Sequence, residues 1–310
     1  MTLRLKDVSA AEVSAGIAFE RRRVGASASG SVLTLVIVTD AAGVQGAVEA
    51  AEETARVHPM RILALVPVAP DARARGRSSA SRLDAEVSTG GDGGPGESAI
   101  LYVSGSLIRH AESVVVPLLL PDTPVVAWWP GAAPRIPAAD PIGALATRRI
   151  TDAAASRQPV RTLATRHTGY QAGDTDLAWT RVTPWRSCMA AVLDEPLDRV
   201  SAAYVEVEAS NPSGPLLAAW LHQRLRSPVV LRTTQGPGIT GLGVITKHAE
   251  VIVNRPDGRR ARLTRTDQPV RTIALPRRKV GELLAEELRR LEPDPVYANA
   301  LRAAAERSYG

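Results

Sequence analysis

The chain contains a single cysteine, Cys188, and its five histidines are scattered along 310 residues. One cysteine excludes an intrachain disulfide and therefore control by internal redox bridging. Because no histidine has a second histidine or a cysteine at ligand spacing, we expect no metal site. Two interpretations of Cys188 stay open: a small buried hydrophobe on a helix, which we favour, and a reactive thiol near a helix N-terminus.

Long apolar runs are also missing. No stretch reaches the roughly 18 apolar residues that would cross a bilayer, and the first residues contain no continuous apolar signal core. We therefore expect a cytoplasmic protein without a membrane partner.

Aromatic residues make up only 4% of the chain, although the net charge of +6 would suit a polyanionic partner. The densest basic clusters lie at residues 21–23, 73–77 and 277–279, and no aromatic residues interleave with them as base-stacking platforms would. We expect no nucleic-acid partner. These clusters fit a solvated face or contact with an acidic protein surface better.

The sequence does contain 45% hydrophobic residues, enough to bury a sizeable core, and its length favours two domains. The alternation of strand and helix patterns predicts an α/β protein. Residues 1–30 are predicted to form an N-terminal helix and link. Residues 31–165 are predicted to form an α/β domain with a mostly parallel sheet and flanking helices. Residues 166–310 are predicted to form a second α/β domain that contains an antiparallel hairpin and ends in helices.

Apolar patterns predict the elements of the first domain. The run from Val32 to Thr39 is continuous and β-branched, as in a central strand covered on both faces. Apolar residues at helical spacing follow to Ala55, and Ile62 to Val66 is a second apolar run. Together these segments predict a right-handed crossover unit.

Three other segments of this half carry expectations. Residues 8–20 are weakly amphipathic and predict a mobile entry helix. The glycine-rich tract at 90–96 predicts a flexible turn and not a phosphate cradle, because a strand follows and no lysine is near. The apolar stripe from Leu107 to Leu119 predicts one helix that is capped by Ser106 and kinked at Pro117.

The second half repeats the pattern. Thr183-Pro184 predicts the start of a helix through Leu193, since Thr is a good cap and Pro fits the first helical position. A strand at 200–207, a helix at 217–225 and a strand at 228–231 predict a second β-α-β unit. Strands at 251–254 and 261–264 predict a hairpin, and apolar spacing predicts a long helix from residue 280 to 291.

The stretch GPGITG, residues 236–241, formally matches the dinucleotide fingerprint G-x-G-x-x-G. The fingerprint works only when a helix N-terminus follows and points at the pyrophosphate. Here the following residues, 242–246, predict a strand. We therefore expect no nicotinamide dinucleotide to bind through this stretch and no resident cofactor.

The strand that ends in Trp128-Trp129-Pro130 is a candidate for a presented surface, because ligand and partner sites gather at the carboxyl ends of strands in α/β proteins. Adjacent strand residues point to opposite faces, so the two indoles cannot enter one core layer. One indole is expected in the core. The other is left open between the core and a cleft or partner surface.

A second candidate segment, GDTDLAWTRVTPWR, runs from Gly173 to Arg186. In principle Asp174 and Asp176 could act as a general acid and base, but loop aspartates more often form Asx-turns. Tryptophan and arginine dominate binding energy at protein interfaces. We therefore predict a partner-binding surface made of both segments, and the alternative is that the indoles pack inside the protein. The predicted residues are Trp128, Trp129, Pro130, Asp174, Asp176, Trp179, Arg181, Trp185 and Arg186.

The sequence has no nucleophile elbow, Walker motif, metal signature or cysteine–histidine constellation. We therefore expect a protein that is not an enzyme. The alternative is an unrecognised α/β enzyme, or a small-ligand-binding protein whose site lies at the carboxyl ends of the strands.

Several unusual strings carry a resemblance: LLLPDTPVVAWWPG, ADPIGALATRRITDAA, GDTDLAWTRVTPWR and LLAEELRRLEPDPVYANAL. From about Val32 onward the chain resembles the actinobacterial form of OpcA, the glucose-6-phosphate dehydrogenase assembly protein family. The resemblance implies a non-catalytic protein that binds this dehydrogenase and promotes its assembly or active state, which supports NADPH production in the oxidative pentose phosphate pathway. Control in cyanobacterial members is tied to cysteine redox state, and the single Cys188 departs from that pattern.

Overall fold

The computed structural model describes residues 2–23, 25, 30–68, 81–89, 96–193 and 199–308. The chain divides into two compact units. Unit 1 consists of residues 1–151, 171–174 and 280–293, and unit 2 of residues 152–170, 175–279 and 294–310. These units differ from the predicted division at residues 30 and 165: the N-terminal helix belongs to unit 1, the chain enters unit 2 at residue 152, and a late helix at 280–287 returns to unit 1.

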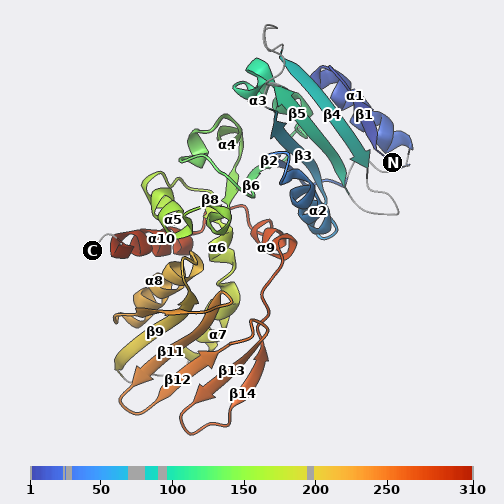
Figure 1. Ribbon diagram of the computed structural model, residues 1–310. Helices are drawn as coiled ribbons and strands as arrows, with labels where there is room; N and C mark the ends of the chain where they lie inside the picture. The colour runs from blue at the N-terminus through green and yellow to red at the C-terminus, as the bar shows by residue number, and fades with distance from the viewer. Residues whose placement is uncertain are drawn as a thin grey trace. The chain divides into compact units, whose positions relative to one another are not determined.

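The sheet of unit 1, sheet A, contains β2 among its inner strands (Figure 1). The apolar residues of β2 are buried on both faces. The strand order is β1-β4-β5-β3-β2-β6-β7-β8. Parallel pairing joins β5, β3, β2, β6 and β7, and β4 pairs antiparallel with both β1 and β5. The predicted mostly parallel sheet is thus confirmed. The bounds are β1 (Leu3–Leu5), β2 (Leu33–Val38), β3 (Met60–Pro67), β4 (Arg82–Thr89), β5 (Glu97–Ser104), β6 (Val125–Trp129), β7 (Arg148–Thr151) and β8 (Asp174–Asp176).

Helix α1 (Ala10–Arg23) packs against β4, so the expectation of a mobile entry helix is wrong. Its residues Val13 and Ile17, one helical turn apart, are buried in the core of unit 1. The remaining helical elements of unit 1 are α2 (Val44–Ala55), η2 (Gly105–Ile108), α3 (Ala111–Val115), η3 (Val116–Leu118), η4 (Pro137–Ala139), α4 (Pro141–Leu145) and α9 (Val280–Glu287).

The single kinked helix expected from Ser106 to Leu119 is also wrong, because this stretch forms three short pieces, η2, α3 and η3. Pro117 lacks the N–H that would bond to the Ser113 carbonyl, and the chain tightens into a 3-10 turn there. Ser104 precedes η2 but makes no capping side-chain bond. Helix α9 likewise ends at Glu287 and does not reach the predicted residue 291.

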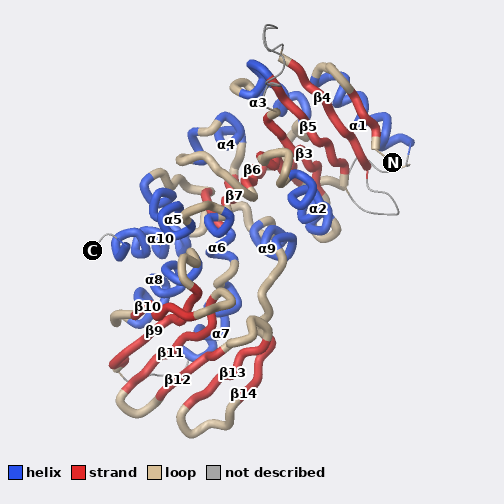
Figure 2. Tube along the Cα trace, in the orientation of Figure 1, coloured by secondary structure: helices blue, strands red, loops and turns tan. Residues whose placement is uncertain are grey.

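The sheet of unit 2, sheet B, has the order β10-β9-β11-β12-β13-β14. Strand β10 runs parallel to β9 with α8 between them in sequence, so the second crossover unit is confirmed. Strands β11 to β14 form an antiparallel meander, which confirms the hairpin (Figure 2). The bounds are β9 (Val200–Glu208), β10 (Val230–Thr234), β11 (Ile239–Thr246), β12 (Glu250–Asn254), β13 (Arg260–Arg265) and β14 (Arg271–Ala274).

Helix α8 covers one face of β9 and also packs on α10 (Figure 1). Leu216, Leu217 and Leu221 on α8 are buried in the unit 2 core. The helical elements of this unit are η5 (Ala153–Ala155), α5 (Pro159–Thr168), α6 (Leu177–Thr180), α7 (Thr183–Leu193), α8 (Ser213–Leu225) and α10 (Pro295–Ser308).

Some expectations fall outside the described residues. These include the arginine cluster at 73–77 and residues 90–95 of the glycine-rich tract. The strands on either side of that tract pair antiparallel, with Thr89 opposite Glu97. Among the helices that the structure describes, none has the length and apolar character needed to cross a bilayer.

Candidate functional site

Both indoles of the Trp128-Trp129 pair are buried, with 0% and 1% of their surface exposed. Strand β6 lies inside the sheet between β2 and β7, and all five of its residues are buried, so both of its faces are covered. Trp129 belongs to the apolar cluster of unit 1, and the Nε1 of Trp128 has no hydrogen-bond partner among the described residues. Neither indole is presented to solvent. Of this stretch, Pro130 alone is half-buried and accessible.

Asp174 is held by Arg149, whose Nε donates to the aspartate and whose Nη1 donates to the Ala146 carbonyl at 2.7 Å. The backbone N–H of Gln171 also donates to Asp174 at 2.8 Å. Each of these residues lies in unit 1. The carboxylate therefore fixes the loop that leads into β8, in keeping with the Asx-type interpretation.

Asp176 lies in unit 2 and caps α6, because its carboxylate accepts from the Ala178 N–H at 2.9 Å and from the Ala153 N–H at 3.0 Å. Asp152 accepts two bonds from the guanidinium of Arg181, both 2.7 Å. Burial lowers the pKa of Arg181, whereas its bonds to Asp152 raise it, and the net shift is upward. Asp174 and Asp176 thus belong to separate structural networks and form no acid–base pair.

Trp179 and Trp185 lie in the core of unit 2, with 2% and 1% exposed surface. Trp179 donates from Nε1 to Asp294 Oδ2 at 2.8 Å, and the guanidinium of Arg186 lies 3.7 Å from its ring centroid. The ring of Trp185 faces Arg255 at 4.8 Å. Both indoles are therefore structural, and of their two arginine neighbours Arg186 is half-buried whereas Arg255 is buried.

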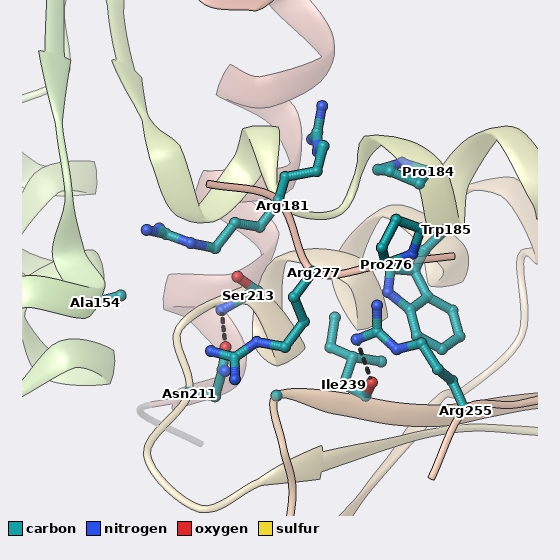
Figure 3. A pocket seen from close by; sticks show the side chains of 12 residues that line it. Ala154, Arg181, Pro184, Trp185, Asn211, Ser213, Ile239, Arg255, Pro276 and Arg277 are labelled. Carbon is teal, nitrogen blue, oxygen red and sulfur yellow. Dashed lines mark hydrogen bonds between the residues drawn. The ribbon is translucent and has the colours of Figure 1, made fainter. Parts of the chain in front are cut away.

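Arg181 and Trp185 also line a cavity of about 180 Å³ in unit 2 (Figure 3). Three further arginines reach the same space: Arg255 follows β12, and Arg277 and Arg278 follow β14. Asn211 enters from the loop after the carboxyl end of β9, which is where α/β sheets commonly place ligands. The fold thus gathers four guanidinium groups that are far apart in sequence.

Arg255 is 5% exposed, and its guanidinium donates to the Leu275 and Ile239 carbonyls at 2.8 and 2.7 Å. No carboxylate among the described residues lies within ion-pair distance of it, and its Nε has no hydrogen-bond partner there. Burial, together with repulsion from Arg277, lowers the pKa of Arg255 to about 10, although Asp257 counters this in part. At neutral pH it therefore carries a largely uncompensated positive charge.

The backbone of GPGITG requires glycine for steric reasons that differ from those in a dinucleotide-binding site. Gly236 and Gly238 adopt φ of +85° and +68° in the turn before β11, a region that favours glycine. Gly241 lies inside β11, where a Cβ would come within 2.5 Å of the Glu206 carboxylate. The strand predicted after this stretch is confirmed, so no helix N-terminus follows to bind a pyrophosphate.

Sequence reasoning found Arg181 and Trp185 but missed Arg255, Asn211 and the role of the basic cluster at 277–279. That cluster was visible as charge alone. No spacing along the chain brings it to Arg255, because the β12–β14 meander and the β9 loop create the neighbourhood. Within the described part of the chain, no group of three or more His, Cys, Asp or Glu side chains could hold a metal ion.

Comparisons with curated sequences and with solved structures do not indicate a function for this chain. No curated protein sequence matches the chain. Solved structures with a similar arrangement include KijD10, a 3-ketoreductase from Actinomadura kijaniata in complex with NADP and TDP-benzene, at 11% identity and a TM-score of 0.46 over 88% of this chain and 95% of that one. An oxidoreductase from Sinorhizobium meliloti is similar at 10% identity and a TM-score of 0.43, over 90% and 89% of the two chains. At such TM-scores neither likeness carries an argument about function.

The family models, by contrast, cover most of the sequence. One, described as the N-terminal domain of the glucose-6-phosphate dehydrogenase subunit, matches residues 51–168. The other, described as the C-terminal domain of the same glucose-6-phosphate dehydrogenase subunit, matches residues 172–301. The two matches follow each other in the order that their names require, and the chain belongs to the OpcA family of glucose-6-phosphate dehydrogenase assembly proteins.

Proposed function

We propose that this protein is a non-catalytic partner of glucose-6-phosphate dehydrogenase that binds the enzyme and promotes its assembly or its active state. By this route it would support NADPH production in the oxidative pentose phosphate pathway. The observation that carries the proposal is the pair of family matches over residues 51–168 and 172–301, both described as parts of a dehydrogenase subunit.

The chemistry of the cavity in unit 2 supports a role without catalysis. Its lining contains arginines, Asn211 and Ser213, but no carboxylate, histidine, cysteine or lysine. The Ser213 hydroxyl donates to the Ala178 carbonyl at 2.9 Å, and no base lies among the lining residues to activate it. Such a lining can bind an anion, but it offers no group for general acid–base work at neutral pH.

The partner-binding surface stays a proposal, and burial narrows what a partner could touch. Of the predicted residues, Pro130, Arg181 and Arg186 are half-buried and accessible. Arg186 is held against the Trp179 ring, so its side chain loses little freedom when a partner binds it. The buried members of the set would act as supports: Trp128, Trp129, Asp174, Asp176, Trp179 and Trp185.

The test uses the purified full chain and the dehydrogenase from the same organism. We expect the two proteins to elute together in size-exclusion chromatography, and NADPH formation at fixed enzyme concentration to increase when the chain is added. Light scattering on the same samples distinguishes assembly, which changes the enzyme's oligomeric state, from activation at constant state. Separate elution together with unchanged NADPH formation would overturn the proposal.

Arg186→Gln tests the surface itself. We expect weaker binding, by about 1 to 2 kcal/mol if Arg186 is an anchor, and a smaller stability loss from the missing cation–π contact. Arg262→Gln is the matched control, because Arg262 is an exposed arginine on β13 of the same unit. Equal affinity of the two variants for the dehydrogenase would show that Arg186 does not belong to the partner-binding surface.

A further inference from the structure

The cavity in unit 2 brings together two cationic side chains that the protein itself does not neutralise. Arg181 is paired with Asp152, and Arg278 donates to the Thr180 carbonyl. Arg277 is exposed, and its guanidinium has no ion pair or hydrogen bond among the described residues. Arg255 is buried and bonded to carbonyls alone, with its Nε left without a partner. No carboxylate of the described residues thus balances the charges of Arg255 and Arg277 at ion-pair distance.

The position of Gly238 shows where these groups meet. A Cβ placed on Gly238 would lie 3.8 Å from Asn211 Nδ2, 3.9 Å from Arg255 Nη2 and 4.0 Å from Arg277 Nε. Nitrogen donors from three separate loops thus surround the open side of one glycine. Figure 3 shows Arg277 extending toward Asn211, and Arg255 against Trp185 and bonded to Ile239. A residue with a side chain at 238 would enter this space.

Arg255 is positioned firmly before any ligand arrives. Its two carbonyl bonds fix the plane of the guanidinium, and the Trp185 ring lies 4.8 Å from it. A pre-organised guanidinium loses little entropy on binding, and its fork matches two oxygens of a phosphate. Its pKa of about 10 keeps it protonated at neutral pH.

We propose that this cavity binds the phosphate group of a small phosphorylated metabolite, held between Arg255 and Arg277 with Asn211 as a further donor. A phosphomonoester carries about −1.5 to −2 charges at pH 7, which matches the two unbalanced guanidinium groups. The cavity of about 180 Å³ has the size of a site for a small molecule. Trp185, Pro184 and Pro276 provide apolar walls for the rest of the ligand. The site does not depend on the dehydrogenase partnership.

The experiment is a calorimetric titration of the full chain at constant ionic strength in a chloride buffer without phosphate. The probes are inorganic phosphate, glucose 6-phosphate, citrate and unphosphorylated glucose. We expect glucose 6-phosphate to bind, glucose not to bind, and the melting temperature to rise with the phosphorylated probe. Binding of inorganic phosphate as well would place the recognition in the phosphate group. Stronger binding of glucose 6-phosphate than of inorganic phosphate would show that the sugar also contributes to the affinity.

Arg277→Gln is the decisive variant, because the Arg277 side chain is exposed and its guanidinium makes no ion pair or hydrogen bond among the described residues. We expect its affinity for the phosphorylated probe to fall about tenfold or more, while its melting temperature without ligand stays that of the parent. Arg277→Lys keeps the positive charge but lacks the two-pronged guanidinium, so its affinity for the phosphorylated probe should lie between those of the parent and Arg277→Gln. Arg262→Gln, an exposed arginine of the same unit, should bind as the parent does.

Three results would each overturn the proposal. They are the absence of binding by both phosphate probes, equal affinity of Arg277→Gln and Arg262→Gln, and binding of citrate in place of the phosphate probes. The last result would mean a carboxylate site.

Discussion

Three buried arginines of unit 1 differ from Arg255 of unit 2 in what balances their charge. In unit 1, Arg61 pairs with Glu97 at 2.6 Å, Arg148 pairs with Glu287, and Arg149 pairs with Asp174. In unit 2, Arg255 is equally buried but is stacked on Trp185 and bonded to carbonyl oxygens, with no carboxylate of the described residues at ion-pair distance.

This contrast separates two uses of the same side chain. An arginine whose charge is cancelled by a carboxylate during folding serves the fold, and removing it leaves a buried negative charge. An arginine held only by a ring and by carbonyl dipoles keeps most of its positive charge. It is therefore available to an anion from outside the chain.

Removing a paired arginine from unit 1 should have the largest effect. Arg149→Met leaves Asp174 without its cation and the Ala146 carbonyl without its donor. We expect the free energy of unfolding to fall by about 3 to 5 kcal/mol in urea denaturation. The control is Arg4→Met, since Arg4 is 74% exposed in its pair with Glu86 and should contribute about 1 kcal/mol or less. Similar losses for both variants would contradict the contrast.

Trp179→Phe tests whether the indoles of unit 2 serve the fold. The change removes the bond from Nε1 to Asp294 and part of the ring under Arg186. We expect a loss of about 1 to 3 kcal/mol in the free energy of unfolding. Trp220→Phe is the matched control, because Trp220 is 5% exposed and its indole donates no hydrogen bond to the described residues. A stable Trp179→Phe with weakened dehydrogenase binding would restore this indole as a partner contact.

Arg277→Gln should leave stability almost unchanged, within about 0.5 kcal/mol in urea denaturation, because Arg277 is an exposed side chain without an ion pair among the described residues. The same variant should lose the rise in melting temperature that glucose 6-phosphate gives the parent. A large loss of stability without ligand would mean that Arg277 serves the fold, as the arginines of unit 1 do.

The pH dependence of phosphate binding should follow the ionisation of the phosphate group and not that of Arg255. Because the pKa of Arg255 is about 10, its guanidinium stays protonated below pH 9, whereas a phosphomonoester gains its second negative charge near pH 6. We expect the affinity for glucose 6-phosphate to increase a few-fold between about pH 5 and 7, measured by calorimetry. An affinity that falls over this range would mean that another group controls binding.

Substitution of Cys188 should have the smallest effect on the function of the protein. Burial raises the pKa of its thiol, so the reactive thiolate is scarcer at neutral pH than in a free cysteine. We expect a thiol-specific reagent to modify Cys188 more slowly in the native protein than in urea. Cys188→Ala should also leave the response of dehydrogenase activity to oxidant unchanged. Rapid native modification, or a lost oxidant response, would favour the reactive interpretation.

Sequence reasoning succeeded where local pattern and burial agree. The run at 32–39 became β2, Thr183-Pro184 opened α7, and the strand after GPGITG became β11. It failed from Ser106 to Leu119, where a continuous apolar stripe is divided into short pieces around Pro117. It also failed at α1, whose weak amphipathic pattern did not reveal that Val13 and Ile17 pack on β4.

Local sequence motifs were enough to identify the family, and apolar periodicity was enough to predict the α/β class. Both are properties of residues that are neighbours in the chain. The burial of the four tryptophans and the gathering of Arg255, Arg277 and Asn211 were decided by tertiary structure alone. Whether an indole is core or surface depends on what covers the second face of its strand or helix. Whether an arginine is paired depends on a carboxylate that is far away in the chain, as Glu287 is from Arg148. Both are set by contacts between distant segments, which no local pattern encodes.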